Sequence, residues 1–94
     1  MTQEELRDYF VDAGYEDALL FEDPSYKTAC VGMTDDGRAV YDYDKMVQYL
    51  IDTDGMEYDE AVEFIQYNTV RSLPYYENAP VIVNFFMFEK NVSD

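Results

Sequence analysis

The first helix is expected between residues 2 and 14, where apolar and polar positions follow a helical period. Thr2 and Glu5 have the spacing of a capping box, in which two residues satisfy each other's backbone N–H groups. Leu6 and Phe10 lie one turn apart, and Gly14 is a stop signal. The pattern therefore predicts a short helix with one apolar stripe.

A β-hairpin is expected next, after a connection over residues 15–26 that contains Pro24. Lys27 to Met33 is predicted as its first strand, with Ala29, Val31 and Met33 on one face. Thr34 to Gly37 has the composition of a turn, because an Asp-Gly pair accepts positive φ angles. Arg38 to Tyr41 then forms the returning strand.

Two helices are expected between residues 42 and 73. Asp42 can cap the first, which carries apolar residues at i, i+3, i+4, i+7 and i+8 and ends at Gly55. Glu57 and Glu60 begin the second, and Pro74 predicts its end at Leu73. One face of this helix carries Tyr58, Ala61, Val62, Ile65 and Thr69, and its partner face carries Phe64, Tyr67 and Arg71. Arg71 could pair with Asp42 or Asp44.

The last predicted element is a strand from Val81 to Met87, rich in β-branched and aromatic residues on both faces. The order αββααβ predicts an α+β fold, a small antiparallel or mixed three-stranded sheet covered by about three helices. At 94 residues the chain is expected to form a single domain, 1–94.

Charge narrows the choice of partner. The net charge of −15 argues against direct binding to nucleic acid or to an anionic membrane, and it favours a basic protein surface as the partner.

With no histidine and only Cys30 as a thiol, the chain lacks the residues of the usual catalytic triads and of a zinc site. Gly55 would place Ala61 at the twelfth position of a calcium loop, where glutamate is needed. We therefore expect no enzyme, no cofactor and no metal.

The excess carboxylates have two explanations, solubility and recruitment of a basic partner by a surface that imitates nucleic acid phosphates. Tyrosine, with ten copies, suits interfaces, because it combines an apolar ring with a hydroxyl. The second explanation predicts contacts by acidic residues together with two aromatic ones. These residues are Glu4, Asp8, Asp12, Asp35, Asp36, Asp52, Asp54, Asp59, Glu60, Glu63, Phe64 and Tyr67.

Residues 37–80 carry a recognisable set of segments, among them Tyr-Asn-Thr-Val-Arg-Ser-Leu-Pro-Tyr at 67–75. In these segments the chain resembles a group of short acidic proteins found in Gram-positive bacteria and in their phages and mobile elements. The resemblance covers about half of the chain and implies a biological setting, without an activity or a mechanism.

The leading hypothesis is a non-enzymatic inhibitor that binds and blocks a basic nucleic-acid-handling protein, as anti-CRISPR and anti-restriction factors of phages do. One alternative is a host regulatory or structural module that forms a homodimer through its C-terminal strand, and another is a small carboxylate-based enzyme or metal binder. A cytoplasmic location is expected, because the chain has one cysteine and its N-terminus has no signal-peptide pattern.

Overall fold

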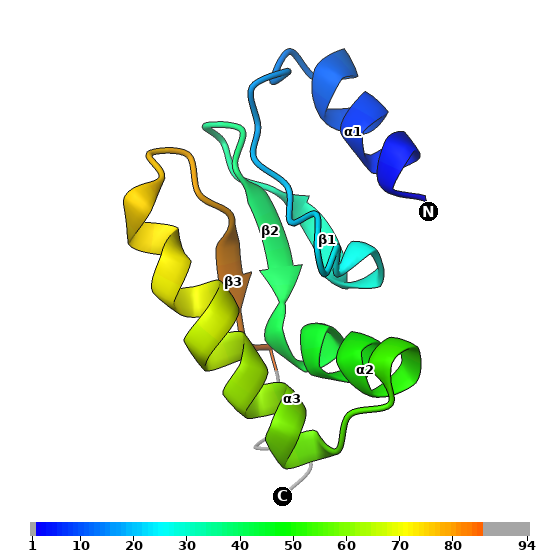
Figure 1. The fold of residues 1–94 in the computed structure, drawn as a ribbon. Coiled ribbons are helices and arrows are strands. Elements are labelled where there is room, and N and C mark those ends of the chain that lie inside the picture. The colour runs from blue at the N-terminus through cyan, green and yellow to red at the C-terminus, as the bar shows by residue number, and fades with distance from the viewer. Residues whose placement is uncertain (1, 86–94) are drawn as a thin grey trace, which may run out of the picture.

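The computed structural model describes residues 2–85 and confirms the α+β class (Figure 1). Its sheet has the order β1-β2-β3, with β2 antiparallel to β1 and parallel to β3. The strands are β1 (Cys30–Met33), β2 (Ala39–Asp42) and β3 (Val81–Val83), and the helices are α1 (Gln3–Asp12), α2 (Tyr43–Asp54) and α3 (Tyr58–Phe64). The sheet is therefore mixed, and the six elements follow the predicted order.

Helix α1 begins at the predicted capping box. The Thr2 backbone N–H donates to Glu5 Oε1 at 2.9 Å, and the Glu5 N–H donates to Thr2 Oγ1 at 3.1 Å. Leu6 and Phe10 are buried, and Gly14 follows the helix with a φ of 93°. Local signals were sufficient here because every group that starts the helix lies within four residues.

The first strand of the hairpin is shorter than predicted. Lys27–Ala29 forms a 3₁₀ turn, η1, and the strand begins only at Cys30. A register shift follows between Cys30 and Gly32 and interrupts the regular pairing of β1 with β2. Ala29 is consequently buried while Val31 is 43 % exposed, so the single face expected for these two residues is wrong.

The hairpin turn holds the preceding connection in place. Gly37 has a φ of 84° and is buried, and a Cβ atom at this position would overlap the ring of Tyr15. The Tyr15 hydroxyl also donates to the backbone oxygen of Asp35 at 3.0 Å. Glycine is therefore required at residue 37 for two reasons, its backbone conformation and the close approach of an aromatic ring.

Helix α2 begins and ends at the predicted signals, whereas the next helical segment begins at the predicted Glu57 and Glu60 but continues past its predicted end. Asp42 accepts from the Lys45 N–H, and Gly55 ends α2 in a left-handed conformation. After α3 the chain continues through a π turn, η2 (Ile65–Thr69), and a 3₁₀ segment, η3 (Val70–Tyr75). The end expected at Leu73 is therefore wrong. Pro74 lacks an N–H but has a φ that suits a helical turn, and the 3₁₀ segment includes it.

One connected core joins the helices to the sheet. Its largest fully buried side chains are Tyr26, Tyr41, Phe10, Met46, Leu50 and Ile65. The Tyr41 hydroxyl accepts from the Phe21 N–H at 3.2 Å, and burial raises the pKa of Tyr41 to about 12. Two of the tyrosines thus serve the core rather than the surface. Tyr58, which shares a helix face by spacing with the buried Ala61 and Ile65, is exposed.

Strand β3 is the predicted C-terminal strand, shortened. It ends at Val83, its three residues are half-buried, and Asn84 and Phe85 lie outside any strand. The rest of the predicted strand, Phe86 and Met87, lies outside the described residues. Within the described part of the chain, no helix combines the length and the apolar character that a membrane span requires.

Candidate functional site

An open groove lies along the outer surface of α3 and η2. It has a volume of about 310 Å³ and is lined by Met56, Glu60, Glu63, Phe64, Tyr67 and Asn68. We call it the α3 groove. Four of the twelve predicted contact residues are among these six: Glu60, Glu63, Phe64 and Tyr67. The structure thus combines two carboxylates and two aromatic rings in one place.

Helical spacing brings these four residues together. Residues three and four positions apart are neighbours on a helix surface, so Glu60 lies beside Glu63 and Phe64. Phe64 is half-buried and packs against the core, whereas Tyr67 is 61 % exposed. The groove therefore has an aromatic base at Phe64 and a second aromatic ring open to solvent.

The α3 groove spans the change from α-helix to π turn. The N–H of Val70 donates to the carbonyl of Ile65, five residues earlier, as in a π turn. The Asn68 side chain donates from Nδ2 to the backbone oxygen of Phe64 at 3.2 Å. Turns of this kind frequently occur at functional sites. Here the turn carries Tyr67 and Asn68 of the groove.

The opposite side of this turn is attached to the core. Thr69 is 6 % exposed, and its hydroxyl makes a buried hydrogen bond of 3.0 Å with the hydroxyl of Tyr26. Tyr26 is fully buried, and this desolvation raises its pKa. A buried hydrogen bond between segments so distant in sequence holds the turn, and the groove on its outer side, in a defined position.

Arg71 was expected to pair with Asp42 or Asp44, but it lies beside Tyr67 instead. Its guanidinium carbon lies 5.8 Å from the centre of the Tyr67 ring, which is a cation–π contact. Glu63, Gln66, Tyr67 and Arg71 line a second open depression that continues the α3 groove. Arg71 reaches this ring readily, because Tyr67 precedes it by four residues and such residues are neighbours on a helix surface.

The other eight predicted contact residues are exposed but lie elsewhere. Asp59 is in the first turn of α3, and Asp52 and Asp54 are in the last turns of α2. Asp35 and Asp36 belong to the hairpin turn, where the Thr34 hydroxyl bonds Asp36. Glu4, Asp8 and Asp12 lie on α1, which Figure 1 shows away from α3. The acidic residues therefore form separate groups.

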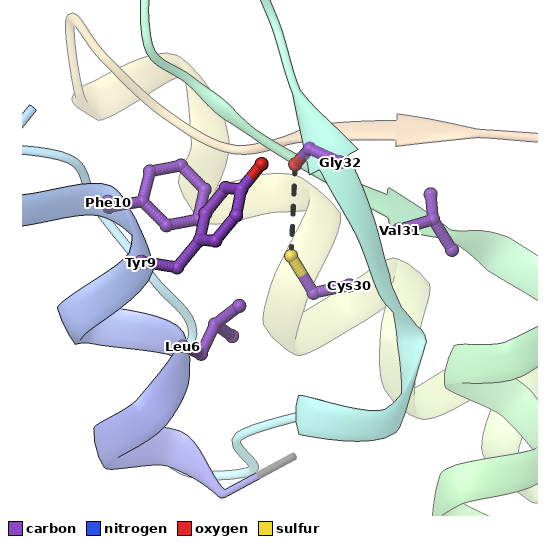
Figure 2. Close-up of a pocket in the computed structure, with 6 residues that line it drawn as sticks. All are labelled: Leu6, Tyr9, Phe10, Cys30, Val31 and Gly32. Carbon is purple, nitrogen blue, oxygen red and sulfur yellow. Dashed lines mark hydrogen bonds between the residues drawn. The ribbon is translucent and has the colours of Figure 1, made fainter. Parts of the chain in front are cut away.

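A separate hollow, which the sequence did not indicate, lies between α1 and β1, away from the α3 groove (Figure 2). Its volume is about 170 Å³, and its lining contains no charged residue. Leu6, Tyr9 and Phe10 face Cys30, whose thiol points toward the Gly32 oxygen at 3.9 Å. Burial raises the pKa of the Cys30 thiol, so the reactive thiolate is disfavoured. The hollow has the character of a packing gap.

The groove also adds residues to the prediction. Met56 and Asn68 line it beside the predicted four. Asn68 has a signal in the sequence, since it lies four residues after Phe64 on the same side of a helix. Met56 has no such signal in the sequence. It precedes α3, and its position in the groove depends on the direction in which the chain enters the helix.

Over residues 2–85 no three His, Cys, Asp or Glu side chains come close enough together to hold a metal ion. Comparison of the chain with protein-family models, with curated proteins and with solved structures found no match. The resemblance to short acidic proteins of Gram-positive bacteria and their mobile elements therefore stays a prediction.

Proposed function

We propose that this protein is a non-enzymatic inhibitor that binds a basic nucleic-acid-handling protein and competes with its nucleic acid. The observation that carries the proposal is the α3 groove, which Glu60 and Glu63 line together with Phe64 and Tyr67. Its setting would be the bacterial cytoplasm, where a phage or mobile element uses such a factor against restriction or CRISPR nucleases. That setting rests on the sequence resemblance.

The α3 groove adds aromatic contact area, which net charge alone does not provide. A charge of −15 steers a basic partner toward the protein and rejects acidic ones, but steering mainly affects the association rate. Slow dissociation needs desolvated contact area, for which aromatic side chains at the centre of an interface are the common source. Phe64 and Tyr67 offer that area in the groove that two carboxylates also line.

The test compares two variants that neutralise the same number of charges. One carries D59N, E60Q and E63Q on α3, and the other carries E4Q, D8N and D12N on α1. Gln at position 60 retains an oxygen that can accept the Glu57 N–H, which Glu60 now does at 3.2 Å. Each protein is titrated into DNA cleavage assays of purified basic defence nucleases at 50 and 500 mM salt.

We expect the wild type to inhibit at least one nuclease at low salt and to lose affinity at high salt. The α3 variant should bind about tenfold more weakly, since each charge pair contributes roughly 0.2–1 kcal/mol, and the α1 variant should lose less. Inhibition indifferent to salt, or equal losses in the two variants, would contradict the proposal. Absence of inhibition across the panel would contradict it as well.

A homodimer through the C-terminal strand is the second candidate. It is favoured by the position of β3 at an edge of the sheet and by Phe85, whose side chain is 54 % exposed. A dimer would show a mass that rises with concentration in sedimentation, and Phe85→Glu would abolish that rise. A monomeric mass at all concentrations would remove this candidate.

A further inference from the structure

The Tyr67 ring is already occupied by a cation in the free protein. Arg71 is the only Lys or Arg between residues 46 and 89, and its guanidinium lies over this exposed ring. Six carboxylates precede it in sequence, at residues 52–63. The acidic surface thus ends on an exposed ring that an arginine of the same chain contacts.

The surroundings of the ring suit a guanidinium better than an ammonium group. A guanidinium is planar, is weakly hydrated and stacks on aromatic faces, while it presents several N–H donors at its edge. Glu63 lies with Tyr67 along the same open depression, and Gln66 adds an amide there. An arginine on this ring therefore stacks in a depression that a carboxylate and an amide also line.

We propose that the Tyr67 ring is the seat of a partner arginine, and that Arg71 is the intramolecular side chain that this arginine displaces. This inference rests on the proposed function, because it takes the α3 groove as the contact surface. It specifies the partner as a protein that presents arginine, rather than lysine, at the centre of its basic surface. Arg71 then lowers the affinity by competition and by repulsion of a like charge.

The experiment uses two peptides of equal charge, nona-arginine and nona-lysine, measured by calorimetry at low salt. The wild type should prefer nona-arginine by about two- to fivefold, the range given by a cation–π contact at an exposed site. Arg71→Gln should tighten nona-arginine binding by a similar factor. Lys45→Gln is the matched control, since it removes one positive charge from an exposed position on α2 and should change the affinity less.

Two substitutions of the ring test the stacking. Tyr67→Leu should bind both peptides with nearly equal affinity, whereas Tyr67→Phe retains a ring and should keep the preference. The exposure of Tyr67 makes both variants compatible with the fold, which circular dichroism would check. In NMR spectra of the wild type, the ring-current shift of the Arg71 δ protons should disappear when nona-arginine is added.

Equal affinity of the wild type for the two peptides would overturn this inference, and so would identical behaviour of Arg71→Gln and Lys45→Gln. Either outcome leaves the nuclease assay, and with it the proposed function, as it stands. Failure of the nuclease assay with an intact arginine preference would instead overturn the proposed partner and retain the arginine seat.

Discussion

Helices α1 and α3 carry similar charge but present different surfaces. Each exposes three of the predicted carboxylates, at residues 4, 8 and 12 on α1 and at residues 59, 60 and 63 on α3. On α1 Leu6 and Phe10 are buried, and the exposed ring of Tyr9 lines a hollow that has no acidic residue in its lining. On α3 the aromatic rings lie among the carboxylates. Charge density alone therefore does not identify a contact surface.

The two helices also differ in regularity. Helix α1 is a capped α-helix that ends beside a glycine, whereas α3 passes into a π turn and a 3₁₀ segment. The irregular helix is the one that carries the groove and that the core holds through the Tyr26–Thr69 hydrogen bond. Local sequence signals predict regular helices most directly. The irregular segment that carries the α3 groove is therefore the part of the fold that these signals describe least well.

The largest expected effect comes from removing one phenylalanine from each helix. Phe10→Ala should lower the free energy of unfolding by about 3–5 kcal/mol, since this fully buried ring leaves a cavity. Phe64→Ala should cost clearly less stability, because its ring is half-buried, but it should weaken partner binding about tenfold. Urea unfolding and the nuclease assay measure the two quantities. An equal loss of stability in both variants would show that Phe64 is a core residue.

A smaller effect is expected at the attachment of the π turn. Thr69→Val leaves the buried Tyr26 hydroxyl without a partner and should cost about 1–3 kcal/mol. Adding Tyr26→Phe removes both hydroxyls and should recover part of this loss. Thr53→Val, at an exposed position of α2, is the control for the change from threonine to valine. Additive effects of the two substitutions would contradict the coupling.

The smallest effect concerns the capping box of α1. The hydrogen bond from the Thr2 backbone N–H lowers the pKa of the Glu5 carboxyl, so the folded state favours the charged form. The resulting stabilisation is present above the ordinary carboxyl pKa of about 4.3 and is lost as pH falls through the lowered value. Glu5→Gln should therefore flatten this part of the acid limb in thermal unfolding. Identical pH profiles would show that the box has no electrostatic role.

Much of the fold could be predicted because its signals are local. The box at Thr2, the cap at Asp42 and the stop at Gly55 all lie where expected, since each involves groups within a few residues. Val31 was assigned to the wrong face for a non-local reason. Its exposure accompanies a register shift in the pairing of β1 with β2, which depends on both strands.

The candidate site could be predicted only in part. Its acidic and aromatic residues were expected as contacts, and four of them do form one groove. The prediction contained no means of separating these four from the eight carboxylates placed elsewhere, because with so many acids almost every exposed element carries some. The location of Arg71 was missed, since pairing with a carboxylate and stacking on a ring are equally compatible with its position in the sequence.

The sequence by itself determined the number, type and order of the elements, the acidic character of the surface and the lack of residues for the common catalytic sites. These properties follow from periodicity, capping groups and composition, which act over a few residues or over the chain as a whole. Only the tertiary structure decided which carboxylates share a surface with aromatic rings, where the π turn lies and which ring Arg71 covers. Those outcomes depend on packing between segments far apart in sequence, such as Tyr26 against Thr69, and no local pattern records such contacts.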